Sequence, residues 1–327
     1  FQKLDTAWFT RVRHRLGKTS KGIKDVSNAI ILLLALLLDA LLGEPKWLWS
    51  RVPHPAVLMG RLIAWADTSF NDPPSQKVKG ALVIAALSIA ALVFGEFLSN
   101  LPGSIQAIIV AIFLAQRSLV DHVQAVADAL RLSVHDGKLM VARIVGRDTA
   151  EMDAPAVARG AIESAAENLS DGVIAPALWF LVFGLPGLFF YKIINTADSM
   201  IGYKTPRHID FGWSAARLDD LLNWVPARLT TLLIAAGYLS SNALKIAWRD
   251  HGLHRSPNAG WPEAAMAGVL DIALSGPRQY HGTSTNDAFV NPEGRHDLDP
   301  QTIDASVNVL WRAWAVLAFA LVVCALF

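Results

Sequence analysis

Six segments of the sequence contain no Asp, Glu, Lys or Arg, and they constrain the fold more than any other feature. A helix needs roughly 17–25 predominantly apolar residues to cross the hydrocarbon core of a bilayer. Segment 172–191 has this length, and two others reach it with one charged residue near an end. The sequence therefore predicts an integral membrane protein with about five or six hydrophobic helices. The six segments are 26–38, 80–95, 105–116, 172–191, 229–244 and 313–327.

The composition supports the same fold class. Hydrophobic residues make up 53% of the chain and charged residues only 17%, whereas about a quarter of the residues in a soluble domain are charged. The shorter apolar segments are either spans with polar ends or buried core helices, and the alternative is a soluble all-α protein with a very apolar core. We expect an all-α, polytopic membrane protein with large polar loops. Residues 26–327 show no repeat or linker, so we expect one membrane-embedded catalytic domain.

The first 25 residues form a basic extension. Apolar side chains alternate with the basic ones, so 1–18 is either an interfacial amphipathic helix or a disordered basic tail. Basic residues before the first span favour a cytoplasmic N-terminus. The whole chain has a net charge of only +1, which argues against a nucleic-acid partner. The single cysteine, Cys324, cannot form an intrachain disulfide.

Segment 172–191 raises a question of topology. If every apolar segment crossed the membrane, the polar stretches 121–171 and 192–226 would face opposite sides, yet both are rich in polar side chains. Lys and Arg are spread evenly over the polar stretches and do not settle the orientation. Because Pro176, Gly184, Pro186 and Gly187 interrupt the apolar segment, we predict that it re-enters or lies buried between the polar segments.

Local signals place the polar motifs on helices and loops. Asp148 and Thr149 are expected to cap a short helix, and Pro155 suits the first turn of a helix over 155–170. Residues 213–224 also have a helical pattern. The stretches 251–262 and 281–300 are rich in Gly, Pro, Asn and Asp and are predicted to be loops.

A ladder of charges precedes the apolar segment 172–191. Arg159, Glu163, Glu167 and Asp171 are four residues apart, so they share one broad face of a helix. Arg159 can pair with Glu163, which leaves Glu167 and Asp171 without a local cation. Clustered carboxylates next to an apolar segment are typical of a Mg²⁺ site. The alternative is a solvated helix face with ordinary ion pairs.

Two further polar clusters follow the same apolar segment. Each combines carboxylates, amides and cations at helical spacing, a pattern suited to metal or phosphate binding. Helix capping, snorkelling and surface ion pairs are the simpler explanations for each cluster alone. Their recurrence around one apolar segment favours a metal- and phosphate-handling face held against the bilayer. The clusters are Lys192, Asn195, Asp198, Ser199 and Lys204, and then Arg217, Asp219, Asp220, Asn223 and Arg228.

Weaker signals lie outside these clusters. His54 sits in a proline-bounded turn, where a structural role is more common than a catalytic one. Arg278, Tyr280 and His281 lie in a turn-rich stretch that is either a site for an anionic group or a simple loop. The sequence contains no P-loop, dinucleotide fingerprint or Ser-His-Asp ordering.

Several long motifs resemble one known family, the adenosylcobinamide-phosphate synthases, or CobD/CbiB family, of cobalamin biosynthesis. The resemblance covers roughly residues 30–325, and the basic extension lies outside it. The motifs are DALLGEP (39–45), HPAVLMGR (54–61), GRDTAEMD (146–153), ARGAIESAAENLSDGVIAPALW (158–179), YKIINTADSMIGYK (191–204), FGWSAARLDDLLNWVPARLT (211–230) and SPNAGWPEAAMAGVLDIALSGPRQYHG (256–282).

The resemblance implies a multi-pass enzyme of the bacterial inner membrane. The expected activity is ATP-dependent amide ligation, which joins adenosylcobyric acid to (R)-1-amino-2-propanol or its O-phosphate and gives adenosylcobinamide or its phosphate. ATP is the expected co-substrate and Mg²⁺ the expected metal. The expected partners are the corrinoid, the amine, the lipid bilayer and other late enzymes of the pathway.

The resemblance and the polar clusters together define the candidate site residues, whose individual roles stay open. The acids are candidates for metal ligation or for the base that accepts a proton from the amine, and the amides and cations for binding substrate or phosphate. The catalytic candidates are Glu163, Glu167, Asp219 and Asp220. The metal candidates are Glu167, Asp171, Asp198 and Asp220. The substrate- or phosphate-binding candidates are Arg147, Arg159, Asn168, Lys192, Asn195, Lys204, Arg217, Asn223, Arg228, His54 and Arg278.

Two other functions compete with the ligase. A Mg²⁺-dependent membrane prenyltransferase also uses Asp and Asn at helix ends, but the longer Asp spacings of its two motifs are absent. A corrinoid transporter would place charges along a translocation path, whereas most polar residues here lie in long loops.

Overall fold

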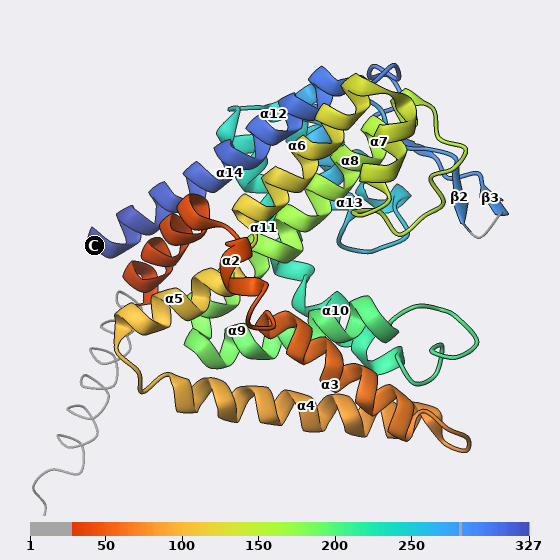
Figure 1. Cartoon of the computed structure of the whole chain (residues 1–327). Helices are drawn as coiled ribbons and strands as arrows, with labels where there is room; N and C mark the ends of the chain where they lie inside the picture. Colours follow the sequence, from red (N-terminus) through yellow and green to blue (C-terminus); the bar gives the residue numbers. More distant parts are fainter. Residues whose placement is uncertain (1–27, 281–282, 327) are drawn as a thin grey trace, which may run out of the picture.

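The chain folds almost entirely into helices (Figure 1). The computed structural model describes residues 28–280 and 283–326, so the predicted basic extension 1–25 and His281 lie outside the described residues. The first described helix covers Asn28–Leu42. The elements that follow are α2 (Lys46–Trp49), α3 (Pro55–Phe70), α4 (Gln76–Leu98), α5 (Gly103–Phe113), α6 (Gln116–Leu132), α7 (Val134–Val141), α8 (Ala154–Leu169), η1 (Ser170–Ile174), α9 (Ala175–Ile201), α10 (Trp213–Leu222), α11 (Trp224–Gly237), α12 (Ser241–Asp250), η2 (His251–Leu253), α13 (Gly260–Leu270), β1 (Leu274–Ser275), β2 (Arg278–Tyr280), β3 (Thr283–Thr285), β4 (Phe289–Val290) and α14 (Pro300–Leu326).

Four described helical stretches are long and apolar enough to cross a membrane, which confirms the predicted all-α, multi-pass class. They are Gln76–Leu98, Gly103–Leu132, Ala154–Ile201 and Pro300–Leu326, and the shorter apolar helix Asn28–Leu42 accompanies them. The fifth predicted apolar segment, 229–244, instead contributes to α11, most of whose second half is buried in the core. Large apolar side chains such as Leu82, Ile89 and Phe97 point outward from α4, as expected for a surface that faces lipid.

Segment 172–191 turns back on itself. Gly184 adopts a non-helical, left-handed conformation (φ 65°, ψ −155°) inside α9, and Pro186 follows it. A straight helix would separate residues 171 and 191 by about 30 Å, yet the Tyr191 hydroxyl lies 2.9 Å from the carbonyl oxygen of Asp171. The two polar ends of the segment therefore lie together, which confirms the predicted re-entrant path.

Close backbone contacts hold the tip of this hairpin. A Cβ added at Gly187 would lie 2.3 Å from the carbonyl oxygen of Trp179, and one at Gly95 of α4 would lie 2.5 Å from the Cα of Pro186. Only glycine leaves room at both points, so α4 can pack directly against the turn of α9.

A π-helical turn, η1, joins α8 to α9 and releases carbonyl groups for other partners. The Gly172 carbonyl accepts a hydrogen bond from the backbone N–H of Ala115 at 3.1 Å, and the Asp171 carbonyl faces Tyr191. Such π-turns interrupt α-helices most often at functional sites, and this one sets the direction of the Asp171 residue.

Helix α8 lies at the centre of the fold, beside α6, α13 and α14 (Figure 1). Its N-terminus is capped by Asp153, whose side chain accepts a hydrogen bond from the N–H of Ala156 at 2.9 Å. Pro155 sits in the first turn as predicted. The predicted short helix capped by Asp148 and Thr149 is wrong, because these residues lie in an irregular segment and the next helix begins at Ala154, directly after its cap Asp153.

The remaining local predictions hold with small corrections. Helix α10 covers most of the predicted stretch 213–224. The predicted loop 251–262 begins with one 3₁₀ turn and ends at Gly260, where α13 starts. The predicted loop 281–300 contains the short strands β3 and β4, which pair antiparallel with β2 and β1.

Candidate active site

Asp219 lies at the centre of a polar cluster that the α9 hairpin and α10 build together. Its Oδ1 accepts a hydrogen bond from Asn195 at 3.3 Å, and its Oδ2 accepts one from Asn223 at 2.9 Å. The side chain is buried. Burial raises the pKa of Asp219 to about 6, although the hydrogen bonds from Asn195 and Asn223 favour the charged carboxylate.

Tyr191 connects this cluster to the π-turn. Its hydroxyl lies 3.0 Å from Oδ1 of Asn223 and 2.9 Å from the carbonyl oxygen of Asp171. This contact orients the Asn223 amide so that its NH₂ group points to Asp219. The Tyr191 side chain is fully buried, so the arrangement is rigid.

Further carboxylates surround Asp219. The charges of Glu167, Asp171 and Asp198 all interact with that of Asp219. In the part of the chain that the structure describes, the positive charge of Lys192 interacts with both Asp171 and Asp219. We call these side chains, with Asn195 and Asn223, the acidic site. Four carboxylates beside one ammonium leave an excess of negative charge that a cation would neutralise.

The donor atoms of the acidic site fit Mg²⁺, but not as a preformed protein cage. Within the described residues, no three His, Cys, Asp or Glu side chains are grouped to hold a metal ion by themselves. The predicted ligand set Glu167, Asp171, Asp198 and Asp220 is therefore not assembled as a complete metal centre. Mg²⁺ usually keeps several waters and takes one or two carboxylates plus substrate phosphates, which is compatible with this arrangement.

Asp220 lines a cavity, unlike its neighbour Asp219, which belongs to the acidic site. It lines a cavity of about 640 Å³ together with Lys204, Arg217 and Arg228, which we call the basic cavity. The Asp220 carboxylate lies 3.9 Å from Arg217. Burial raises the pKa of Asp220, while the positive charges of Arg217 and Lys204 oppose this shift.

A buried asparagine fixes the wall of the basic cavity. Asn258 donates a hydrogen bond to the carbonyl oxygen of Asp220 at 2.7 Å and accepts one from Arg228 at 3.1 Å. The Arg228 guanidinium also stacks on the rings of Trp224 and Trp261. The loop before α13 is thereby tied to the end of α10.

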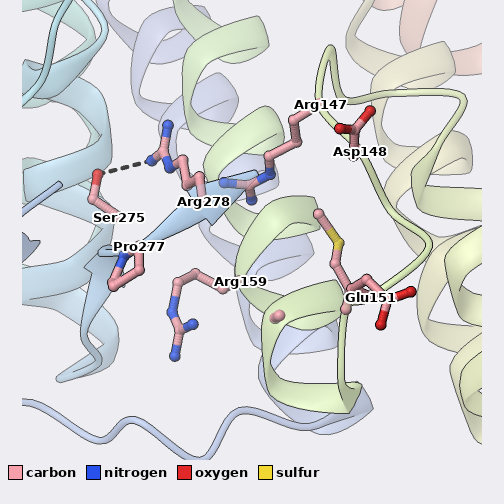
Figure 2. Close-up of a pocket in the computed structure, with 9 residues that line it drawn as sticks. Arg147, Asp148, Glu151, Arg159, Ser275, Pro277 and Arg278 are labelled. Carbon is pink, nitrogen blue, oxygen red and sulfur yellow. Dashed lines mark hydrogen bonds between the residues drawn. The ribbon is translucent and has the colours of Figure 1, made fainter. Parts of the chain in front are cut away.

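A second cation-rich pocket lies at the other end of α8. Arg147, Arg159 and Arg278 line a cavity of about 200 Å³ with Ser275, which we call the arginine pocket (Figure 2). Arg278 donates a hydrogen bond to the Ser275 hydroxyl at 2.8 Å. Three guanidinium groups in one small pocket are suited to a carboxylate or phosphate.

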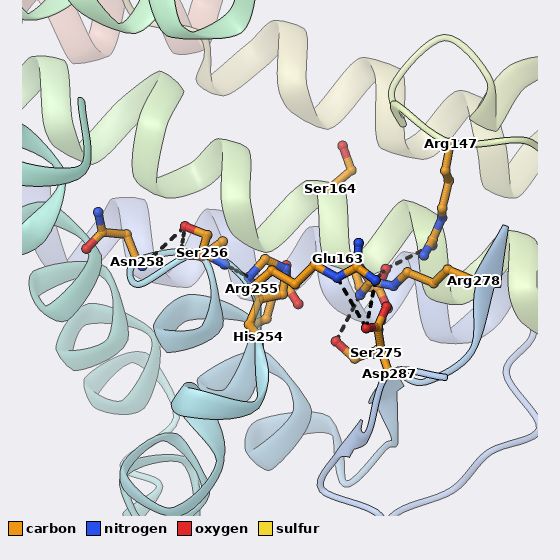
Figure 3. Close-up of polar contacts among 12 residues, drawn as sticks. Arg147, Glu163, Ser164, His254, Arg255, Ser256, Asn258, Ser275, Arg278 and Asp287 are labelled. Atoms are coloured by element: carbon orange, nitrogen blue, oxygen red, sulfur yellow. Dashed lines mark hydrogen bonds and ion pairs between the residues drawn. The ribbon is translucent and has the colours of Figure 1, made fainter. Parts of the chain in front are cut away.

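Glu163 anchors this pocket rather than facing a ligand. Its Oε2 lies 2.8 Å from Arg147 and 3.2 Å from Arg278, and its Oε1 accepts a hydrogen bond from the N–H of Ser275 at 2.6 Å (Figure 3). Because both oxygens contact neighbouring groups of the protein, this geometry favours a positioning role for Glu163, and its predicted catalytic role stays a prediction.

Arg159 departs from the predicted pairing with Glu163. Its guanidinium donates to the carbonyl oxygens of Ala273 at 3.2 Å and His296 at 3.1 Å. The predicted pairing was wrong because Arg147 and Arg278, which lie outside α8 in the sequence, form the ion pairs with Glu163. Arg159 still lines the arginine pocket (Figure 2).

Glu167 lies between the two ends of the site. Its charge interacts with Arg278 and Glu163 on one side and with Asp219 on the other, and its side chain is accessible to solvent. The charged residues spaced along α8 and η1 therefore have different surroundings. Glu163 contacts the arginines of the arginine pocket, and Asp171 belongs to the acidic site. Glu167 lies between the arginine pocket and the acidic site.

Two predicted substrate-binding residues lie elsewhere. Asn168 donates hydrogen bonds to the carbonyl and hydroxyl oxygens of Ser164, and it lines a separate cavity near α6. His54 caps α3, with its Nδ1 accepting from Ala56 and its Nε2 lying 3.1 Å from the carbonyl of Ile112. Capping accounts for both ring nitrogens, so the structural interpretation of His54 is the one that the geometry favours.

Sequence reasoning missed an additional buried pair, Glu263 and His254. Glu263 is buried in the first turn of α13, and its Oε1 lies 3.5 Å from Nε2 of His254. The His254 Nδ1 accepts a hydrogen bond from the N–H of Ser256, so the ring proton of the neutral imidazole faces Glu263. A lone carboxylate in the apolar helix GWPEAAMAGVL was the signal in the sequence.

Glu263→Gln is expected to stabilise the protein increasingly as the pH rises. Burial, together with the charges of Glu163 and Glu167, raises the pKa of Glu263 well above 4.5. The folded state therefore holds a proton that the unfolded state releases, so the stability of the wild-type protein falls as the pH rises above 4.5. Glutamine has no charge and still accepts from His254.

The melting temperatures of the purified proteins in detergent would test this prediction. We expect wild type and Glu263→Gln to melt alike near pH 4.5 and the variant to melt higher at pH 8. The exposed Glu151→Gln serves as a control and should show no such divergence. A difference that stays constant between these pH values would contradict the assignment.

These observations define a helical, multi-pass membrane protein with an acidic site and two cation-lined cavities. A comparison with protein-family models matches residues 32–310 to the family described as CobD/Cbib protein. The chain belongs to this CobD/CbiB family. The resemblance seen in the sequence motifs is thus confirmed.

Several curated relatives align over nearly their whole length, and each is named "Cobalamin biosynthesis protein CobD". The protein from Sinorhizobium sp is 48% identical over 88% of this chain and 95% of its own length. The Brucella suis protein is 48% identical over 88% and 94%, and the Rhodobacter capsulatus protein is 42% identical over 90% and 96%. No solved structure matches the chain.

Proposed function

We propose that this protein acts in cobalamin biosynthesis as an ATP-dependent amide ligase that joins adenosylcobyric acid to (R)-1-amino-2-propanol or its O-phosphate. Membership of the CobD/CbiB family and the names of the curated relatives support the pathway. The observation that carries the reaction class is the acidic site, in which carboxylates of α8, α9 and α10 converge beside two phosphate-compatible cavities.

Amide formation from a carboxylate needs activation, because an oxide is a poor leaving group. In the proposed reaction, the substrate carboxylate takes the terminal phosphoryl group of ATP and becomes an acyl phosphate. The amine nitrogen then forms the C–N bond, the C–O bond to phosphate breaks, and phosphate leaves with the electron pair. The nitrogen gives up its proton to a carboxylate of the protein.

The position of each residue suggests its role in the proposed reaction. Glu167 is the proposed proton acceptor, because it is accessible to solvent and lies between the arginine pocket and the acidic site. Lys192 and Asn195 orient oxygen atoms at the acidic site. Asp198 and Asp219 would hold Mg²⁺, which would neutralise phosphate charge when bound.

The proposed setting is the inner membrane of a bacterium. The long apolar helices provide the multi-pass anchor, and the corrinoid, the amine and ATP would reach the polar face of the α9 hairpin. Other late enzymes of the pathway are proposed neighbours, since they would handle the same corrinoid.

The test uses purified protein in detergent or liposomes. We expect ATP to be consumed with adenosylcobyric acid and the amine present together, and mass spectrometry to detect the amide product. The proposal fails if ATP consumption does not depend on either substrate or if no amide forms. A parallel incubation with labelled prenyl diphosphate would reveal prenyl transfer, and uptake of corrinoid into liposomes would reveal transport.

A further inference from the structure

The basic cavity has the size and shape of a site for a medium-sized ligand. It lies between the loop that follows α9, helix α10 and the loop 251–257, and its volume is about 640 Å³. Small-molecule sites usually measure roughly 300–1,000 Å³. The arginine pocket, at about 200 Å³, falls below this range and suits a smaller anionic group.

Cations outnumber carboxylates on the wall of this cavity. Lys204, Arg217, Arg228 and Arg255 line it, with Asp220 as the acid among the described lining residues. Lys204 and Arg217 are exposed, and both charges interact with Asp220. This row of cations matches a polyphosphate better than a single carboxylate.

Aromatic side chains form another part of the wall. Tyr203 and Trp213 line the cavity and are both exposed. The ammonium of Lys77 lies 4.1 Å from the centre of the Trp213 ring. Exposed aromatic rings beside cations commonly bind a nucleobase by stacking on its face, without hydrogen bonds that recognise its identity. Among the described residues, those that line the arginine pocket include no aromatic side chain.

The cavity also lies next to the acidic site. Asp220 lines its wall and is the neighbour of Asp219 in α10, and the charge of Asp220 interacts with that of Asp198. A chain of phosphates lying over Lys204 and Arg217 would therefore end next to the acidic site, where a phosphoryl group could be transferred.

We propose that the basic cavity binds a nucleoside triphosphate, with its base against Tyr203 and Trp213 and its phosphates over Lys204 and Arg217. The smaller anionic group of the second substrate then occupies the arginine pocket, so the two ligands enter separate cavities. The chemical role of this site rests on the proposed ligase function, but nucleotide binding itself can be measured without turnover.

Calorimetric titration of the full-length protein in detergent with ATP, and separately with inorganic tripolyphosphate, tests the site. Trp213→Ala is expected to weaken ATP binding about tenfold and to leave tripolyphosphate binding unchanged, because it removes only the stacking surface. Arg217→Ala is expected to weaken both ligands about tenfold. Its side chain is exposed, so this variant should fold normally even if Trp213→Ala does not.

Two variants serve as matched controls. Trp248 of α12 and Arg159 of the arginine pocket do not line the basic cavity, so Trp248→Ala and Arg159→Ala should bind ATP as wild type does. The inference is overturned if ATP binding survives Trp213→Ala and Arg217→Ala, or if Arg159→Ala alone abolishes it. Cavity-dependent ATP binding without any amide product would refute the proposed ligase and leave this site in place.

Discussion

Asp219→Asn is expected to lower kcat for amide formation by about 10²–10³-fold, the loss that follows removal of one key electrostatic group from an active site. The carboxylate of Asp219 accepts from both Asn195 and Asn223 and interacts with every other carboxylate of the acidic site. An amide of the same shape removes the charge at the centre of that arrangement.

The measurement is steady-state turnover with both substrates, alongside ATP titration and the melting temperature. We expect Asp219→Asn to stay folded and to bind ATP, since Asp219 is not among the residues that line the basic cavity. Asp121→Asn is the matched control, because Asp121 is an exposed residue paired with Arg117. Turnover within threefold of wild type in Asp219→Asn would remove the acidic site from the mechanism.

Glu163→Ala is expected to destabilise the protein by about 3–5 kcal/mol, the usual effect of breaking a buried ion pair by deleting one partner. Glu163, Arg147 and Arg278 are all largely buried, with side-chain exposures of 7%, 8% and 11%. Without the carboxylate, two guanidinium groups lose a negative partner inside the protein, and the N–H of Ser275 loses the oxygen that accepts its hydrogen bond.

Thermal unfolding in detergent, with activity measured on the folded fraction, would check this prediction. Glu151→Ala is the matched control, because Glu151 lines the same pocket but its side chain is exposed. We expect it to melt within a degree or two of wild type. A Glu163→Ala protein as stable as this control would show that Glu163 does not hold the arginine pocket together.

The chain path of the central hairpin was predictable from the sequence. Glycines and prolines inside segment 172–191, together with polar clusters on both sides, indicated re-entry, and the contact between Tyr191 and Asp171 confirms it. The convergence of Asp171 with Lys192 and Asp219 follows from the same turn. Helical spacing and helix-breaking residues are local signals, so they can be recognised in the sequence without knowledge of tertiary contacts.

The partners of the charged residues were less predictable. Spacing on α8 favoured an Arg159–Glu163 pair, but Arg147 and Arg278 take Glu163 through contacts of long sequence separation. The pair of Glu263 and His254 was also missed, because the loop before α13 brings these residues together and helical spacing does not reveal that contact. Spacing also could not show that Asp219 belongs to the acidic site while the adjacent Asp220 lines the basic cavity. That difference depends on how loop 251–257 packs against α10.

The most direct test of the proposed mechanism follows one oxygen atom. Adenosylcobyric acid carrying ¹⁸O in its reacting carboxylate would be converted by the purified protein, and the released phosphate would be analysed by mass spectrometry. Activation of the carboxylate by phosphoryl transfer predicts one ¹⁸O atom in each phosphate released with the amide. Amide formation with unlabelled phosphate would contradict an acyl phosphate and, with it, the role assigned to the acidic site.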